Sequence, residues 1–267
     1  MQKLFNNILV PVHLNKGTEQ IMDKAIEFAN QLDCHVHFLF NLRAGLLPWG
    51  AKRKIEEKRK KIYELKERFR KKTGSRLKLF FQVRVDDVKN QIVTYACTNA
   101  IDMVLLDSYL NGSHFLDDNL DPGKLASYIN CPVLAASHFP DVPPLKTIVL
   151  PVDRVVPVNK VRIAVCLAKQ FDSSIHLVVL ENDSSHHEMT CMQRVFELLK
   201  NNTDIPVACQ TVQGKSLRDG ALQYSQSMKD SLIVMNTGKE SPATSFFDRL
   251  QFLFGSKHRT VPVMTVA

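Results

Sequence analysis

The sequence predicts an α/β protein built from two tandem, doubly wound parallel sheets of five strands each. Three observations lead to this class. Short apolar segments rich in β-branched residues alternate with amphipathic segments of helical period, which is typical of parallel strands covered by helices on both faces. The second half of the chain repeats the first at an offset of roughly 140 residues. The length of 267 residues also exceeds the usual size of one domain.

The repeat is clearest at the start of each half. Residues 8–12 (ILVPV) match residues 148–152 (IVLPV), and both segments lead into a helical pattern. Identities continue through the helix and the next strand, where Ala25, Ala29, Gln31, Asp33 and His37 match Ala164, Ala168, Gln170, Asp172 and His176. Near the ends of the halves, residues 102–106 match 231–235 and residues 131–134 match 261–264. We therefore predict domains at residues 1–140 and 145–267, joined by the short proline-rich segment 137–144.

The elements of the first half follow in order from their residue patterns. We expect strands at residues 8–12, 36–40, 77–85, 103–106 and 133–136. The first helix has apolar residues at spacings of three and four, namely Ile21, Ala25, Phe28, Ala29 and Leu32. Asp86-Asp87 supplies an N-cap for a helix that runs to about Thr98. Asp121-Pro122 opens a short helix, with aspartate as the cap and proline in the first turn.

Right-handed crossovers between five such strands give the strand order 3-2-1-4-5 in each half. This order places a topological switch point between the first and fourth strands, and a ligand is expected there, at the carboxyl ends of the strands. Pro11 and Pro151 are in tension with this arrangement, because a central strand rarely accommodates a missing N–H group. Both prolines lie near the end of their strand.

The net charge of +8 is concentrated in one predicted helix. Residues 52–72 contain twelve Lys and Arg against four Glu, so the rest of the chain is neutral overall. Apolar residues recur there at helical spacing, namely Ile55, Ile62, Leu65 and Phe69. One stripe can therefore pack on a core while the basic side chains face water. A polyanion contact is the alternative, but we see no aromatic interleaving that supports it, so nucleic acid is not the favoured partner.

The cysteines and the apolar segments bound the location of the protein. Six cysteines are scattered without a C-x-x-C pair, which indicates neither a disulfide framework nor a zinc site: Cys34, Cys97, Cys131, Cys166, Cys191 and Cys209. We expect them to be reduced and mostly buried. No segment approaches the roughly 20 apolar residues of a membrane span, and the start of the chain lacks the layout of a signal peptide. We therefore expect a cytoplasmic protein without membrane contact.

The second half contains a combination of segments that resembles the universal stress protein family. These are a first strand IVLPVD, a helix ending in AKQFD, a strand LIVM and a closing VPVMTV. The first half has the same skeleton, so the resemblance covers almost the whole chain. It implies the Rossmann-like fold of the adenine nucleotide alpha hydrolases, with the two copies packed as a pseudo-dimer. It also implies an adenine-nucleotide site at the switch point in some members, and signalling or stress tolerance without nucleotide in others.

ATP-binding members of that family have an aspartate at the end of the first strand and, after the fourth strand, a glycine loop that ends at a helix start. Asp153 occupies the first position in the second half and is the candidate contact to a nucleoside, unless it caps the following loop. Gly238 matches the first glycine of the loop, but Ser241 stands where the family often has another. In the first half His13 replaces the aspartate. The resemblance therefore implies at most a degenerate ATP site, in the second half.

No sequence motif for catalysis is present: a P-loop, a G-x-S-x-G elbow, an H-E-x-x-H helix and paired-cysteine sites are all missing. His186-His187 and Glu188 could nominate a metal site, but they open a helix in a polar stretch typical of the surface. His37 and His176 occupy matching strand positions, which indicates a repeated scaffold contact rather than chemistry. We therefore expect a protein that is not an enzyme and holds no metal.

The sequence thus favours a tandem universal stress protein that acts in stress response or signalling by binding a ligand or a partner. One alternative is an ATP-binding switch with weak hydrolysis that uses Asp153 and Gly238. Another is a polyanion binder that uses residues 52–72. The closing strands after Pro132 and Pro262 are sheet edges, and we expect such edges to pair within one chain or across a homodimer.

Overall fold

The structure is a computed structural model that describes residues 3–42, 51–73, 77–84, 87–107, 120–136, 145–155, 158–181, 186–228, 230–237 and 261–267. The chain divides into two compact units, Met1–Asp141 and Val142–Ala267. The predicted linker 137–144 lies outside the described residues.

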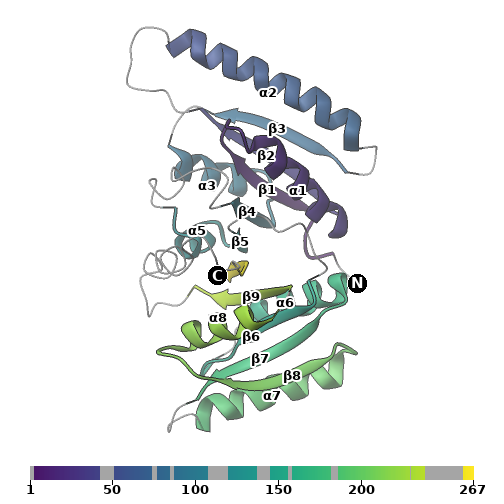
Figure 1. The fold of residues 1–267 in the computed structure, drawn as a ribbon, viewed down its shortest axis with the longest axis vertical. Coiled ribbons are helices and arrows are strands. Elements are labelled where there is room, and N and C mark those ends of the chain that lie inside the picture. Colours follow the sequence, from purple (N-terminus) through teal and green to yellow (C-terminus); the bar gives the residue numbers. More distant parts are fainter. Residues whose placement is uncertain are drawn as a thin grey trace. The chain divides into compact units, whose positions relative to one another are not determined.

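The first unit is a parallel sheet with helices between its strands (Figure 1). Its described elements, in chain order, are β1 (Asn7–Val12), α1 (Thr18–Gln31), β2 (His35–Asn41), α2 (Ala51–Thr73), β3 (Leu79–Arg84), α3 (Val88–Thr98), β4 (Met103–Asp107), α5 (Pro122–Ile129) and β5 (Val133–Ala136). The strand order is β3-β2-β1-β4-β5, with every pair parallel. The predicted fold class and strand order are therefore confirmed for this unit. Asp87 and Asp121 also cap α3 and α5 as predicted. Each carboxylate accepts a hydrogen bond from the backbone N–H group three residues later.

The second unit repeats this arrangement. Its described elements are β6 (Thr147–Pro151), α6 (Val158–Phe171), β7 (Ser174–Leu180), α7 (His186–Asn202), β8 (Val207–Val212), α8 (Leu217–Ser227), β9 (Ser231–Asn236) and β10 (Val263–Val266). The order β10-β9-β6-β7-β8 is again 5-4-1-2-3 in terms of the unit's own strands, and all pairs are parallel. Residues 238–260 lie outside the described part of the chain.

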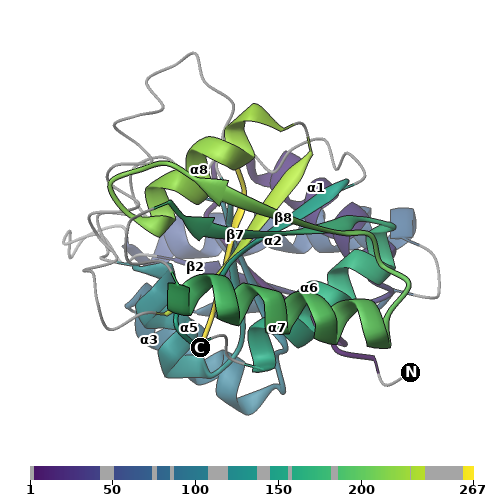
Figure 2. The ribbon, with the colours of Figure 1, turned by 90° about the horizontal axis from the view of Figure 1, so that it is seen from below.

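Helices cover both faces of each sheet, which explains why the central strands are apolar on both sides. In the second unit α6 and α7 lie on one face and α8 lies on the other (Figure 2). The middle of each sheet is completely buried, as at Leu9 of β1, Val104 of β4, Val149 of β6 and Ile233 of β9. The core of each unit is therefore built around its first and fourth strands, the same two strands that flank the switch point.

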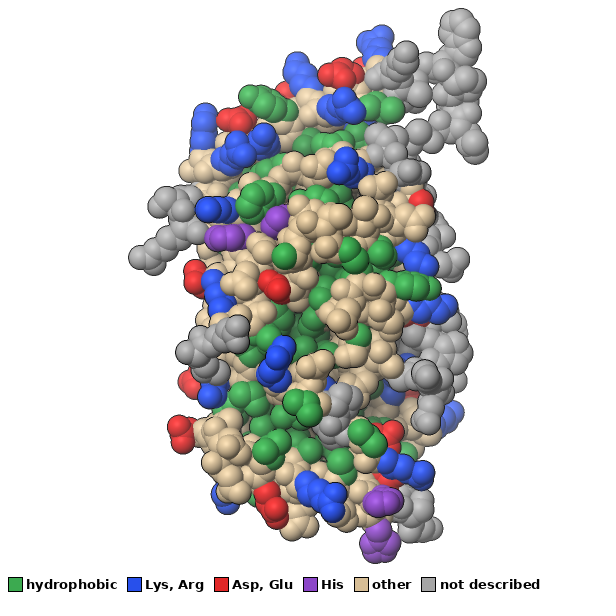
Figure 3. All heavy atoms as spheres, turned by 180° about the vertical axis from the view of Figure 1, so that it is seen from behind, with side chains coloured by type: hydrophobic (Ala, Val, Ile, Leu, Met, Phe, Trp, Pro, Cys, Tyr) green, Lys and Arg blue, Asp and Glu red, His purple; other side chains and the backbone are tan. Residues whose placement is uncertain are grey.

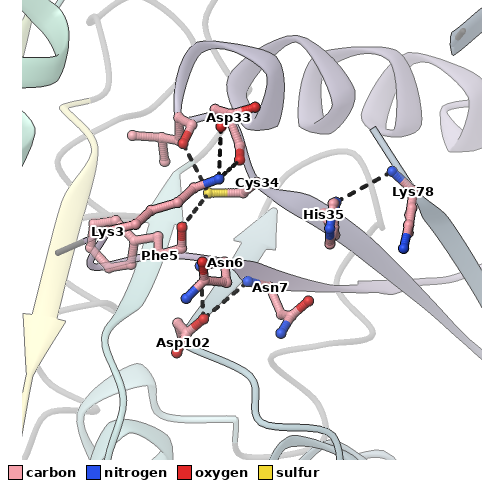
Figure 4. Close-up of polar contacts among 10 residues, drawn as sticks. Lys3, Phe5, Asn6, Asn7, Asp33, Cys34, His35, Lys78 and Asp102 are labelled. Carbon is pink, nitrogen blue, oxygen red and sulfur yellow. Dashed lines mark hydrogen bonds and ion pairs between the residues drawn. The ribbon is translucent and has the colours of Figure 1, made fainter. Parts of the chain in front are cut away.

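Polar contacts hold the start of β1 between its neighbours (Figure 4). The Asp102 carboxylate, just before β4, accepts hydrogen bonds from the backbone N–H groups of Asn6 (2.8 Å) and Asn7 (3.0 Å). On the other side, the buried Cys34 thiol donates to the Phe5 carbonyl at 3.1 Å. These bonds satisfy backbone groups that precede the regular ladder and so fix where the central strand begins.

Pro11 and Pro151 lie beyond the point where the central strand of each unit stops pairing with one of its two neighbours. Pairing of β6 with β9 ends at Val149, whereas pairing with β7 continues to Pro151. The Val152 N–H donates to the Val178 carbonyl of β7 at 2.8 Å, so the alternation along a strand turns the backbone groups of Pro151 toward β9, beyond the last β6–β9 pair. A missing N–H at that point removes no ladder hydrogen bond. The same reasoning applies to Pro11, because pairing of β1 with β4 ends two residues earlier. The tension in the sequence pattern is thereby resolved.

His37 and His176 make the same contact in their two units, as predicted. Nδ1 of His37 lies 3.0 Å from the Tyr95 hydroxyl of α3, and Nδ1 of His176 lies 2.8 Å from the Tyr224 hydroxyl of the equivalent helix α8. Burial lowers the pKa of His37 to about 4 and also lowers the pKa of His176. Both rings are therefore neutral at pH 7 and tie a strand to the helix that covers it.

Candidate functional site

At the carboxyl edge of the second unit's sheet, β6 and β9 stop pairing before either strand ends, which leaves an opening in the sheet between them. Val149 and Ile233 form the last pair between these strands, and the rest of β9 pairs with β10 instead. Helix α6 begins at Val158, shortly after β6, and packs against both β6 and β9. The predicted switch point therefore exists in the structure, and the side chains that surround it come from the end of β6, the first turn of α6 and the end of β9.

Lys160, in the first turn of α6, is the most unusual side chain at this edge. Only 4% of its surface is exposed, and its Nζ donates a hydrogen bond to the Pro151 carbonyl at the end of β6. Burial lowers the pKa of Lys160 to about 7, against a smaller opposing effect from the Asp153 carboxylate. The Lys160 amino group is thus held at the switch point in surroundings that disfavour its charged form.

Asp153, the predicted nucleoside contact, follows β6 and is exposed. Its Oδ1 accepts a hydrogen bond from the Arg154 N–H at 2.8 Å, so it supports the start of the loop that follows β6. The neighbouring Arg154 reaches α7, where its Nε lies 3.2 Å from Oε1 of Glu188. Hydrogen bonds from the backbone and from Arg154 hold the pKa of Glu188 below its usual value. Asp153 thus lies near enough to Lys160 for its charge to act on that group's pKa, while Gly238 and Ser241 lie outside the described residues.

Asn236 ends β9 on the far side of the opening. Its Oδ1 is buried and has no hydrogen-bond partner among the described residues. A buried amide oxygen without a partner is costly in a protein interior. Asn236 and Lys160 were both missed by sequence reasoning. For Lys160 a signal was present, because the repeat that aligns Ala25 with Ala164 also aligns Lys160 with an apolar residue of the first half.

That apolar residue is Ile21, and it marks the difference between the two units. Ile21 is completely buried in α1, at the position that Lys160 occupies in α6. Just before this position, the Thr18 hydroxyl donates to the His13 carbonyl at 2.9 Å. The first unit therefore fills this position with a hydrocarbon side chain, and the second unit fills it with a cation.

The remaining candidates do not form a site in the described residues. His186 and His187 are exposed in the first turn of α7, and the described part of the chain contains no group of three or more potential metal ligands. Among the cysteines, Cys34 and Cys131 are buried, but Cys97 and Cys209 are exposed. The expectation that the thiols are mostly buried is therefore wrong for these two. Cys97 lies on α3, and Cys209 lies on the outer strand β8 of the second unit.

Helix α2 buries one stripe and exposes its charges, as predicted. The buried stripe consists of Ile62, Leu65 and Phe69. The charged side chains that face water include Lys60, Lys61 and Arg70, and Lys and Arg side chains appear in blue over this end of the first unit (Figure 3). The division into an apolar and a solvated side is what a helix lying on a sheet requires.

One flank of α2 combines basic residues with an aromatic ring. Arg59, Tyr63, Lys66 and Arg70 recur at spacings of four, three and four, which places them along one side of the helix. Tyr63 is 61% exposed, and Lys66 Nζ lies 6.0 Å from the centroid of its ring. The expectation that no aromatic residue interleaves with the charges is therefore wrong on this flank.

Solved structures similar to the whole chain include two universal stress proteins. A universal stress protein from Archaeoglobus fulgidus has a TM-score of 0.67 at 15% identity, over 100% of this chain and 99% of that one. A putative universal stress protein from Pseudomonas aeruginosa has a TM-score of 0.59 at 13% identity, over 98% and 94%. The cytoplasmic domain of a prokaryotic cation chloride cotransporter has a TM-score of 0.54 at 12% identity, over 98% and 95%.

These likenesses show that the chain has the universal stress protein fold, as the resemblance of its segments to that family implied. No protein-family model matches the sequence, and no curated protein matches it either. Because one of the similar structures belongs to a transporter, the fold alone does not fix the function. Within the described residues, no helix is long and apolar enough to cross a membrane.

Proposed function

We propose that the chain is a tandem universal stress protein that acts by binding and not by catalysis, with its ligand or partner at the carboxyl edge of the second unit's sheet. The observation that carries this proposal is the contrast between Lys160 and Ile21 at one position of the shared scaffold. A buried cation is costly where a hydrocarbon packs well, so its presence indicates a role beyond folding. Asp153 and Asn236 lie at the same edge and supply polar groups that a ligand can meet.

A nucleotide is one ligand class that this edge could take, because the resemblance gives Asp153 the position of a nucleoside contact. We expect calorimetry with ATP and Mg²⁺ to detect binding to the full chain, and the Asp153→Ala variant to bind at least tenfold more weakly. Asp204→Ala is the matched control, since Asp204 is exposed on the loop between α7 and β8, away from this edge. The absence of heat with the unmodified chain would remove the nucleotide from the proposal and leave a different ligand or a protein partner.

Pairing of the closing strands is a further part of the proposal. Within its own unit, β5 pairs with β4 and β10 pairs with β9, so each is the outer strand of its sheet on that side. Outer strands offer unpaired backbone groups, and association between two such edges satisfies them. We expect the two units to tumble as one body in NMR relaxation, either within a monomer or in a homodimer whose mass light scattering detects. Independent tumbling of the units in a monomer would contradict this pairing.

A second candidate function, polyanion binding, is favoured by the flank of α2 that carries Tyr63. An exposed ring among basic side chains can stack on a base while the cations contact phosphates. A triple variant of this flank, Arg59→Gln, Lys66→Gln and Arg70→Gln, should lose retention on heparin and on single-stranded DNA. The control removes the same charge from exposed positions elsewhere on the helix, as Arg53→Gln, Lys60→Gln and Lys71→Gln. Equal loss in both variants, or retention insensitive to salt, would exclude a specific flank.

A further inference from the structure

Lys160 lies at a position that disfavours a charged side chain in three respects. It is 4% exposed, at a position where the first unit places a completely buried isoleucine. It lies in the first turn of α6, where the partial positive charge of the helix N-terminus disfavours a cation. Lysine is also among the residues that are almost never fully buried without a partner. A sequence that sets aside local preference at one buried position does so most often at a functional site.

The charge of Lys160 is only partly compensated within the described residues. An ammonium group has three donors, and Lys160 makes one hydrogen bond, to the Pro151 carbonyl. Asp153 and Cys191 are the titratable groups that act on it, from the end of β6 and from α7, and both favour the charged form. Their effect is smaller than that of burial, and no carboxylate in the described part of the chain forms an ion pair with Lys160. Arg154 and Glu188 pair with each other and so add no net charge.

A second, independent observation lies across the opening of the sheet. The buried Oδ1 of Asn236, at the end of β9, has no partner in the described residues. The amide oxygen only accepts hydrogen bonds, but turning the side-chain amide over places its NH₂ group at this buried position, and in that orientation Asn236 donates. Because Pro151 and Asn236 end two parallel neighbouring strands, the amino group bound to the Pro151 carbonyl and the Asn236 amide belong to the same edge of the sheet. Both have hydrogen-bonding capacity that the described residues do not use.

We propose that this edge binds a small anion, a carboxylate or phosphate group, with Lys160 as its counter-ion and the Asn236 amide and the N-terminus of α6 as further donors. This inference rests on the proposed binding function and names the chemical class of the ligand. It differs from the nucleotide expectation, in which phosphates lie at the loop after the fourth strand and a nucleoside lies beside Asp153. Here the anion takes the place beside Asp153. The Asp153 carboxylate is exposed, so water and salt screen its repulsion of the anion. Its Oδ1 also accepts a hydrogen bond from the backbone N–H of Arg154.

The test uses the full chain, with inorganic phosphate and acetate as separate probes at constant ionic strength. A ligand that binds only the folded state raises Tm, by about 3–5 °C at a tenfold excess over its dissociation constant. We expect phosphate, acetate or both to raise the Tm of the unmodified chain. The Lys160→Met variant, which keeps an unbranched side chain one atom shorter and removes the charge, should lose this shift. The matched control is Lys169→Met, which removes an exposed charge from the last turn of the same helix and should keep the shift.

The titration of Lys160 gives a readout at the site itself. The pKa of this group, which burial lowers to about 7, should rise by a unit or more when the anion binds. Spectra of ¹³C-labelled lysine follow it, and the resonance absent from Lys160→Met identifies it. An equal Tm shift in all three proteins, or an unchanged Lys160 titration, would place the anion elsewhere and overturn the inference.

Failure of this inference is distinguishable from failure of the proposed function. If the chain bound ATP through Asp153 but responded to neither phosphate nor acetate, the binding function would stand and the anion site would be refuted. If phosphate acted through Lys160 while ATP gave no heat, the anion site would stand and the nucleotide would be excluded. A response to acetate without phosphate, or the reverse, identifies the anion as a carboxylate or a phosphate.

Discussion

Replacing Lys160 with methionine should stabilise the folded chain at neutral and acidic pH, by an amount that disappears as the pH approaches 10.5. Burial lowers the pKa of this group from 10.5 to about 7. Each pKa unit corresponds to 1.36 kcal/mol, so the charged form costs the folded state at most about 5 kcal/mol. The lost hydrogen bond to the Pro151 carbonyl offsets about 1 kcal/mol of the gain. We therefore expect a net stabilisation of about 2–4 kcal/mol at pH 6.

The pH dependence follows from protonation of the two states. Below pH 7 Lys160 is protonated in both the folded and the unfolded chain, so the full cost is present. Between pH 7 and 10.5 the folded state releases the proton that the unfolded state keeps, and the stability of the unmodified chain rises with pH. Above pH 10.5 the group is neutral in both states and the cost is gone. Methionine does not titrate, so the difference between the two proteins closes over this window.

The measurement is urea unfolding followed by circular dichroism between pH 6 and pH 10.5, because urea does not screen charges. If the two units unfold in separate transitions, only the transition of the second unit should move. Lys169→Met controls for the loss of one positive charge from α6. A difference in stability that stays constant across this pH range would refute the reasoning, as would a methionine variant less stable than the unmodified chain at pH 6.

Three further predictions concern the scaffold. Since the pKa of His37 is lowered to about 4, acidification from pH 6.5 to 4 should lower the urea midpoint of the first unit, and a His37→Phe variant should show a weaker pH dependence. Gly220→Ala should destabilise by about 1–2 kcal/mol in urea although alanine favours helices, because the new Cβ would lie 2.7 Å from Val212 Cγ2; a gain in stability would contradict this close packing of α8 on β8. Mass spectrometry after iodoacetamide treatment of the native chain should find Cys97 and Cys209 modified and Cys131 unmodified, since burial raises the pKa of Cys131 to about 12; early labelling of Cys131 would show that its surroundings open readily.

Much of the fold could be predicted because its determinants are local or periodic. Alternating apolar segments gave the strands, and the rules of handedness and connection gave their order. The aspartate caps of α3 and α5 could be read from two or three residues. The matching histidines indicated a repeated contact, but their tyrosine partners lie 58 and 48 residues away and became visible only when the helices were placed on the sheet.

The polar groups of the candidate site were harder to predict, because their meaning depends on burial. A lysine near a helix start is ordinarily a surface residue, and only its alignment with Ile21 marks Lys160 as a core position. Asn236 looks like an ordinary strand end until its amide oxygen is found buried without a partner. Pro151 gave a further indication of where the site lies. A proline fits a central strand only where that strand no longer pairs with one of its neighbours.

The two units share a scaffold but differ in the residue at one of its core positions. Packing contacts are kept in both, as the His37–Tyr95 and His176–Tyr224 pairs show, so the demands of folding are the same in each unit. At one core position those demands are met by Ile21 in the first unit and set aside by Lys160 in the second. Selection for stability alone would favour the hydrocarbon in both places. If an anion binds beside Lys160, as we propose, it offsets the cost of the buried charge, and this makes the second unit's carboxyl edge the place to look for the ligand.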